Sequence, residues 1–141
     1  MSLNAVIILL LNGLLIFSTE AQLICRVCGQ QVADKMDILD LPTENSMYSY
    51  SQNVLGKEAL VQRLVNPANI KFDVITTKKA RVILQGQSSS SDTWFPGMRW
   101  TAAVCKNCQH HVGWHFQAPA GSLKENFYGL ILERLVSKDC K

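Results

Sequence analysis

Residues Thr93–Phe116 read TWFPGMRWTAAVCKNCQHHVGWHF, and this stretch decides how the chain folds. It contains every tryptophan of the 141-residue sequence: Trp94, Trp100 and Trp114. Between the last two lies a Cys-x-x-Cys pair, a spacing typical of a zinc-binding turn. Large indoles crowded around such a turn indicate either an aromatic core or an aromatic box that is open to a ligand.

A second Cys-x-x-Cys pair lies near the start of the chain. Two such pairs can hold one tetrahedral ion, so we expect one structural zinc bound by Cys25, Cys28, Cys105 and Cys108. The ion would join the start of the domain to a late hairpin, and its affinity would contribute to the free energy of folding. The alternative is two disulfides, but a bridge within Cys-x-x-Cys closes a strained loop that is typical of redox motifs.

The N-terminal segment resembles a secretory leader. Residues 5–17, AVIILLLNGLLIF, form an uncharged apolar run that is short for a bilayer span, and the small-residue segment STEA follows it. We therefore expect residues 1–21 to be a signal peptide cut after Ala21, which leaves residues 22–141 as one secreted domain. The alternative is an uncleaved anchor, because residues 1–4 carry no basic side chain. Such an anchor would be the only membrane contact.

Charge and the fifth cysteine say little about partners. The formal net charge of +3 becomes +4 without the leader, which contains one acid and no base. The basic side chains cluster only at residues 78–81, so we expect no nucleic acid partner, which would need a sustained basic patch with interleaved aromatic residues. Cys140 is either an idle thiol or the link of a disulfide-bonded dimer.

Short strand signals follow one another along the domain, without a repeat. The patterns predict strands over residues 36–41, 70–77, 80–85, 99–104 and 111–117. The second and third of these would form a hairpin over Lys78-Lys79, and the last two an antiparallel hairpin around the late cysteine pair. Loops are expected over residues 43–56 and 86–92, and a helical turn over 122–126. Periodicity leaves residues 57–65 and 127–136 open between helix and strand.

Alternation within the late hairpin brings the aromatic rings together. Residues two apart on a strand point the same way, so Trp114 and Phe116 share a face. We expect Trp100 on the partner strand to face Trp114, and the bend at Pro96-Gly97 to place Trp94 as a third wall. The residues alone leave an open cage and a plain aromatic core as alternatives, because buried aromatic side chains usually pack against one another.

Three elements within residues 93–116 carry a family resemblance: Trp-Phe-Pro-Gly-x-x-Trp-Thr, Cys-x-x-Cys and His-x-Gly-Trp-x-Phe. Together they closely resemble the CULT domain family, the thalidomide-binding domain of cereblon. The first cysteine pair, the Asn66-Pro67 turn and the segment FYGL at residues 127–130 are similar to further elements of the family. The likeness spans residues 25 to about 136.

The resemblance implies an all-β fold, a β-tent of two roughly orthogonal antiparallel sheets joined at a four-cysteine zinc site, with residues 127–136 as a strand. It also implies a site for a cyclic imide such as glutarimide, held by main-chain groups that correspond to the Asp92 carbonyl and the Trp94 N–H and carbonyl. Asp92 replaces a histidine and Met98 a tyrosine, so the rim of this site differs from that of cereblon. The implied ligand-binding residues are Trp94, Trp100, Trp114, Phe116, Asn66, Pro67, Asp92 and Thr93.

We therefore expect a zinc-stabilised binding module for a small cyclic imide, or for a protein end that carries one, and not an enzyme. Residues 22–141 leave no room for the Lon-like domain and helical segment that dock cereblon to a ubiquitin ligase. The alternative enzyme is a thiol reductase, because the fold is similar to that of methionine sulfoxide reductases. These need a nucleophilic cysteine in the last strand, and residues 127–136 contain none. A third possibility is a zinc-stabilised protein-interaction domain without an open cage.

Overall fold

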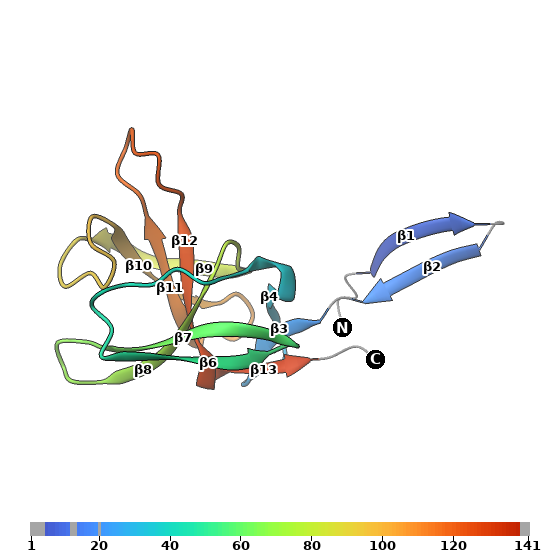
Figure 1. The fold of residues 1–141 in the computed structure, drawn as a ribbon, viewed down its shortest axis with the longest axis horizontal. Coiled ribbons are helices and arrows are strands. Elements are labelled where there is room, and N and C mark those ends of the chain that lie inside the picture. The colour runs from blue at the N-terminus through green and yellow to red at the C-terminus, as the bar shows by residue number, and fades with distance from the viewer. Residues whose placement is uncertain (1–4, 12–13, 20, 139–141) are drawn as a thin grey trace.

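A computed structural model describes residues 5–11, 14–19 and 21–138, and it is built from antiparallel strands (Figure 1). The first strands are β1 (Ala5–Leu11), β2 (Leu14–Thr19), β3 (Gln22–Cys25), β4 (Gln31–Asp34), β5 (Ile38–Leu39), β6 (Tyr48–Val54) and β7 (Lys57–Val65). The remaining strands are β8 (Lys71–Thr77), β9 (Val82–Ser89), β10 (Arg99–Cys105), β11 (His111–Gln117), β12 (Phe127–Ile131) and β13 (Leu135–Lys138). Two short 3₁₀ turns, η1 (Lys35–Asp37) and η2 (Leu132–Arg134), interrupt them.

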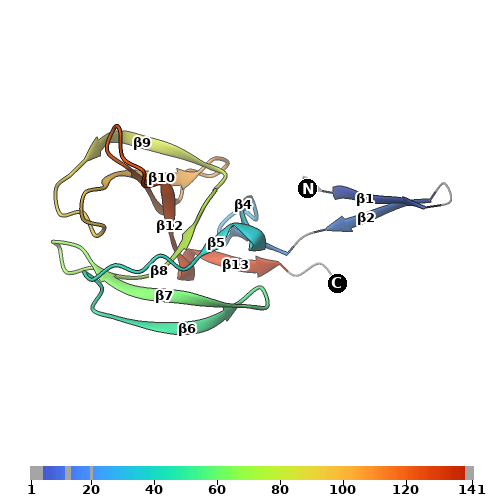
Figure 2. The ribbon, with the colours of Figure 1, turned by 45° about the horizontal axis from the view of Figure 1, so that its top comes forward.

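Two sheets make up the domain. The larger runs in the order β6-β7-β8-β12-β11-β10-β9, with β5 added beside β8, and the smaller in the order β13-β3-β4. Figure 2 shows β6, β7 and β8 along one side of the domain and β9, β10 and β12 along the other. The all-β class with antiparallel sheets that meet at the four cysteines is confirmed, because β3 and β10 each end on a cysteine of the cluster.

β8 connects the two halves of the larger sheet. Its first residues pair with the end of β7, whereas residues 74–77 pair with β12 and residues 76–77 also with β5. β8 therefore leaves β7 halfway along, so the first half of β7 has only β6 as its neighbour. This change of partner lets one continuous sheet turn from one side of the domain to the other (Figure 2).

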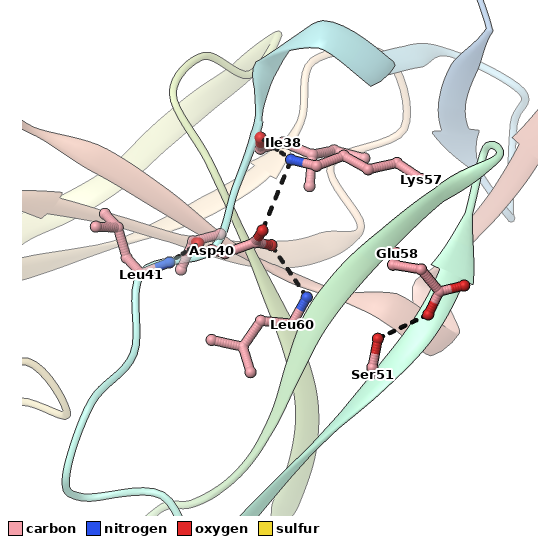
Figure 3. Close-up of polar contacts among 8 residues, drawn as sticks. Ile38, Asp40, Leu41, Ser51, Lys57, Glu58 and Leu60 are labelled. Atoms are coloured by element: carbon pink, nitrogen blue, oxygen red, sulfur yellow. Dashed lines mark hydrogen bonds and ion pairs between the residues drawn. The ribbon is translucent and has the colours of Figure 1, made fainter.

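Polar side chains fill the place that β8 leaves beside β7 (Figure 3). The Leu60 N–H donates to Asp40 Oδ1 at 3.1 Å, and Lys57 Nζ donates to the Ile38 carbonyl at 2.7 Å. The Leu41 N–H donates to Thr76 Oγ1 at 3.2 Å. These bonds satisfy backbone groups that would otherwise lack a ladder partner, and they hold the segment after β5 against the sheet.

Several local expectations were wrong because strand partners are chosen over long distances. Residues 70–77 and 80–85 form strands but no hairpin, since β8 pairs with β7, β12 and β5 while β9 pairs with β10. Residues 48–54 of the expected loop form β6, a largely exposed edge strand, and β9 continues to Ser89. Residues 36–41 supply only the two-residue strand β5, and residues 122–126 contain no helical turn.

The segments that the sequence left open are strands. Residues 57–65 are β7, whose residues 57–63 pair with β6. Residues 127–136 form β12, the turn η2 and the start of β13, so this segment crosses from the larger sheet into the smaller one. The hairpin of β10 and β11 forms as expected.

The hydrophobic core has two clusters. One lies around the small sheet and the cysteines, and includes Leu23, Val32, Val61 and Leu130. The other is aromatic and lies under the tryptophans, where the rings of Phe95, Phe116 and Phe127 pack with centroids 4.7–5.1 Å apart. The aromatic cluster is the floor on which the candidate ligand site is built.

β1 and β2 within the expected leader pair only with each other. Among the residues described, no helix has the length and apolar character needed to cross a membrane. Cys140, predicted to be either an idle thiol or the link of a dimer, lies outside the described residues.

Candidate functional site: a metal centre and an aromatic cavity

The four predicted cysteines come together at the junction of the two sheets. Their sulfur atoms all lie within 4.8 Å of one another, with 3.7 Å between Cys25 and Cys108 and 3.5 Å between Cys28 and Cys105. A tetrahedral zinc with Zn–S bonds of about 2.3 Å requires sulfur atoms about 3.8 Å apart, whereas a disulfide requires about 2.05 Å. The cluster therefore fits one zinc ion and not two disulfides, and the predicted structural zinc site is confirmed.

The two cysteine turns have the same backbone design. The Cys25 N–H donates to the Gln30 carbonyl at 2.8 Å, and the Cys105 N–H donates to the His110 carbonyl at the same distance. In each turn the residue after the second cysteine has a positive φ, 79° at Gly29 and 63° at Gln109. Each turn thus presents both thiols on one side, and two copies that face each other complete the ligand set.

Local hydrogen bonds prepare one thiol for the metal. Hydrogen bonds from the Asn107 side chain and then from the Gln30 backbone lower the pKa of Cys28 to about 6. Burial raises the pKa of Cys105. Since zinc binds thiolates, the ion must displace the remaining protons, and its affinity decreases as the pH falls.

The first cysteine turn also holds the segment that follows β12. The Arg26 N–H donates to the Arg134 carbonyl at 3.0 Å, and Arg26 Nε donates to the Glu133 carbonyl at 2.7 Å. Arg26 Nη2 reaches the Leu135 carbonyl at 3.3 Å. The metal centre and the turn η2 are therefore directly linked.

The three tryptophans line one cavity of about 440 Å³ on the aromatic cluster. Trp114 on β11 is buried, while Trp94, in the loop before β10, and Trp100 on β10 are half-buried. The rings of Trp94 and Trp114 meet edge to face with centroids 4.7 Å apart. In the β10–β11 register Trp100 lies opposite Phe116 and not opposite Trp114, so the two tryptophans are diagonal neighbours on the expected face.

Hydrogen bonds fix two of these indoles. Trp94 Nε1 donates to the Val65 carbonyl at 2.9 Å, and Trp100 Nε1 donates to the Ser91 carbonyl at 2.8 Å. In the part of the chain that the structure describes, Trp114 Nε1 has no protein acceptor. Two indoles are thus held with satisfied N–H groups, whereas the third keeps a free donor.

The backbone beside Trp94 has both used and unused groups. The Trp94 carbonyl already accepts hydrogen bonds from Thr43 Oγ1 and Asn45 Nδ2. It is therefore not available as the ligand contact that the resemblance implies. Within residues 21–138, the Trp94 N–H and the Asp92 carbonyl have no hydrogen-bond partner in the protein. Asp92 has a φ of 53°, the left-handed conformation of a tight turn.

Seven of the eight predicted ligand-binding residues line the cavity, and Thr93 does not. The Thr93 hydroxyl instead donates to the Phe95 carbonyl at 3.2 Å, which stabilises the turn. Five lining residues were not predicted: Ile70, Phe72, Ser91, His111 and Arg134. The same alternation that gives Trp114 and Phe116 one face could have found Phe72 on β8, but no local pattern points to Arg134 in its 3₁₀ turn.

Arg134 and His111 form a fixed pair at one end of the cavity. Arg134 Nη1 donates to the His111 carbonyl at 2.9 Å and lies 3.2 Å from His111 Nδ1. An arginine only donates, so Nδ1 is the acceptor, and the proton is on Nε2, which donates to the Gly113 carbonyl at 2.8 Å. Burial, with a further contribution from the charge of Arg134, lowers the pKa of His111 and so favours the neutral ring.

A second, larger hollow of about 690 Å³ contains no tryptophan and none of the predicted site residues. It lies between the segment after β5, the Phe95–Met98 turn and residues 124–127. Its walls supply no cluster of groups comparable to the aromatic cavity.

This combination of fold and site defines a class: a small all-β domain whose two sheets are joined by a four-cysteine zinc centre beside an aromatic cavity. The chain belongs to the Yippee-Mis18 family, described as "Yippee zinc-binding/DNA-binding /Mis18, centromere assembly", which matches residues 21–139. Within that family it is a CULT-like domain similar to part of cereblon.

Cereblon from several vertebrates shows the likeness. The chain is 32% identical to Gallus gallus cereblon over 114 residues, which is 79% of this chain and 24% of that protein. It is 32% identical to Xenopus tropicalis cereblon, over 82% of this chain and 23% of the relative, and 31% identical to Danio rerio cereblon, over 81% and 24%. The chain thus spans about a quarter of the length of these relatives.

Proposed function

We propose that this domain is a zinc-stabilised binding module whose aromatic cavity takes a cyclic imide such as glutarimide. The observation that supports the proposal is the convergence of Trp94, Trp100 and Trp114 on one cavity of about 440 Å³. Flat apolar walls suit the methylene groups of a small ring, and a few polar groups at the edge fix its orientation.

The unused backbone groups match the edge of an imide, which presents an acceptor, a donor and an acceptor in a row. The Asp92 carbonyl would accept from the imide N–H, and the Trp94 N–H would donate to one imide carbonyl. The second imide carbonyl would stay at the open side, because the Trp94 carbonyl is occupied and is itself an acceptor. Asn66 and Pro67 would border the mouth, and Phe116 the base.

The test is a titration of the zinc-loaded protein with glutarimide and with thalidomide, followed by indole fluorescence. We expect saturable quenching in the micromolar range, roughly −7 to −8 kcal/mol, because a small ring gains affinity from a preformed box. Trp100→Ala should lose most of this affinity.

The matched control is Tyr48→Ala, which removes an exposed aromatic side chain from the edge strand β6, outside the cavity lining. It should bind as the parent does. A folded, zinc-loaded protein that gives no response to either compound would refute imide binding and leave a protein-interaction domain as the better proposal.

The proposal includes no catalysis. The cysteines of the described chain all belong to the metal cluster, so a sulfoxide reductase mechanism would have to use Cys140, outside the described residues. Purified protein should not reduce methionine sulfoxide with dithiothreitol as reductant. Turnover that disappears in Cys140→Ser would instead support the thiol enzyme.

Two further parts of the proposal concern partners and location. The family description names DNA binding, yet Arg81 of the basic cluster is paired with Asp34 at 2.9 Å, so we propose no nucleic acid partner. A mobility-shift assay with double-stranded DNA at 150 mM salt tests this.

The physiological ligand would be a small imide or a protein end that carries one. The signal peptide over residues 1–21 and secretion stay predictions, and N-terminal sequencing of protein from a eukaryotic culture medium tests both.

A further inference from the structure

Arg134 is the one cationic residue in the lining of the aromatic cavity, as far as the described chain goes. It is half-buried in the turn η2, and its guanidinium lies over the Phe72 ring, 5.6 Å from the centroid. Phe72 in turn contacts both Trp94 and Trp114, with centroids 6.1 and 5.1 Å away. The Phe72 ring thus contacts both the Arg134 guanidinium and the two indoles.

The guanidinium is held in a fixed orientation with donors to spare. Nη1 is used by the His111 carbonyl and Nδ1, whereas Nε and Nη2 have no protein acceptor among the described residues. Trp114, whose indole N–H has no protein acceptor among the described residues, lines the same cavity. Unused donors of a preorganised arginine are well suited to a carboxylate, because the planar fork can donate two parallel hydrogen bonds.

The other charged residue of the lining does not cancel this preference. Asp92 is exposed, in the loop that precedes Trp94, so water screens its charge. His111 is neutral in its hydrogen-bonded tautomer, and the remaining lining residues are apolar or uncharged. The half-buried Arg134 therefore sets the electrostatic potential at its end of the cavity.

We propose that the cavity selects ligands that carry a carboxylate, and that Arg134 is the residue that determines this specificity. The inference rests on the proposed imide binding and narrows its ligand class to acidic imides. The imide ring of the ligand would lie between the indoles, with its polar edge at the Asp92 carbonyl and the Trp94 N–H. A substituent on the ring would extend past Phe72 and place its carboxylate against Arg134 Nε and Nη2.

The test uses matched probes that differ only in charge. Glutarimide with an amine at C3 is acylated with succinic or glutaric acid, so each probe ends in a carboxylate at one of two reaches, and each has a neutral carboxamide counterpart. Calorimetric titration of the zinc-loaded protein gives the ratio of the two affinities. We expect the better acid to bind at least about ten-fold more tightly than its amide, a typical gain for a charge-assisted hydrogen bond.

Variants assign the effect to Arg134. Arg134→Gln should reduce the acid-to-amide ratio to about one. Arg134→Lys keeps the charge without the fork and should retain part of the ratio. If Arg134→Gln does not fold, the ratio in the parent protein and its partial reduction in Arg134→Lys still decide the question.

The outcomes separate the two proposals. If acids and amides bind equally, carboxylate selection is wrong and imide binding stands. If none of the four probes binds but glutarimide does, carboxylate selection is wrong and imide binding stands. If glutarimide does not bind either, both are wrong. A fifth probe, cyclohexylamine acylated with succinic acid, has the carboxylate but no imide. If it binds as well as the acidic imides and loses this affinity in Arg134→Gln, carboxylate selection holds and imide recognition is wrong.

Discussion

Gly113 and Gly129 lie on the neighbouring strands β11 and β12, beside the aromatic cluster. A Cβ atom at Gly113 would lie 2.0 Å from the Gly129 carbonyl oxygen, so the backbones of two paired strands would have to separate. A Cβ atom at Gly129 would lie 3.0 Å from Cε2 of Phe116 and 3.1 Å from Cγ1 of Val74, which are both side-chain atoms. The difference between backbone and side chain decides how costly each substitution is.

We expect Gly113→Ala to lower the free energy of unfolding by roughly 3 kcal/mol or more, and Gly129→Ala by roughly 1–2 kcal/mol. Urea denaturation of the zinc-loaded variants measures both values. Equal losses would mean that the strands adjust at Gly113 as easily as the ring does at Gly129.

His115 lies on the face of β11 opposite the indoles, with its ring 4.9 Å from that of Tyr128. Burial lowers its pKa below the ordinary 6.5. The unfolded chain therefore binds a proton at His115 at a higher pH than the folded chain does, and stability must fall as the pH drops below about 6.5.

His115→Gln should lose less stability than the parent between pH 7 and pH 5.5. Both proteins lose zinc affinity in this range, so the measured quantity is the difference between their urea unfolding free energies at the two pH values. The same loss in both proteins would show that His115 titrates alike in the folded and unfolded states.

At the scale of elements, the first cysteine turn holds η2 through Arg26. This residue contributes two side-chain hydrogen bonds to carbonyls on either side of Arg134. Because Arg26 is exposed, Arg26→Ala should cost only roughly 1 kcal/mol of stability. Amide hydrogen exchange should increase in η2 and at the start of β13.

Mass spectrometry of the exchanged peptides checks this expectation, with Arg26→Lys as the control that keeps the charge but loses the paired donors. Exchange in η2 that stays at the parental rate in both variants would show that the Arg26 side chain does not hold this turn.

The elements also show how far sequence reasoning reaches. The β10–β11 hairpin was predictable because both strands are adjacent in the chain and the cysteine turn lies between them. The partners of β8 and β9 were not, because a run of β-branched residues predicts a strand without naming its neighbour. β6 was missed because an exposed edge strand of polar residues has no buried face to reveal it.

Local sequence patterns also predicted only part of the candidate functional site. The cysteine spacing predicted the metal centre fully, since four thiols in two close pairs leave few geometries. Trp94, Trp100 and Trp114 were found through their motif. Arg134 was not, because its place in the cavity depends on η2 returning from the larger sheet toward the cysteines, and only the assembled fold determines that path.

At the scale of the whole molecule, zinc bound by the four cysteines would link the two sheets through metal–sulfur bonds. β3 supplies one cysteine turn and β10 the other. We expect one zinc ion for each chain, and we expect its removal by a chelator to lower the melting temperature by roughly 15 °C or more. Elemental analysis and circular dichroism with and without chelator measure the two quantities.

Cys28→Ser should give the same result without chelator, because the site then has only three thiolates. Cys140→Ser is the matched control, as it removes a cysteine outside the cluster. A chelated protein that melts at the parental temperature would show that the two sheets hold together without the ion.

The hydrogen bonds from Arg26 to η2 connect the metal centre to the aromatic cavity. They connect a residue between two zinc ligands to the carbonyl of Arg134, whose side chain lines the cavity. Thermodynamic linkage is reciprocal: by whatever factor zinc raises the affinity for a ligand that contacts Arg134, that ligand raises the affinity for zinc. If this factor exceeds one, a protein with an occupied cavity would keep its zinc at lower free zinc concentrations than a protein with an empty one.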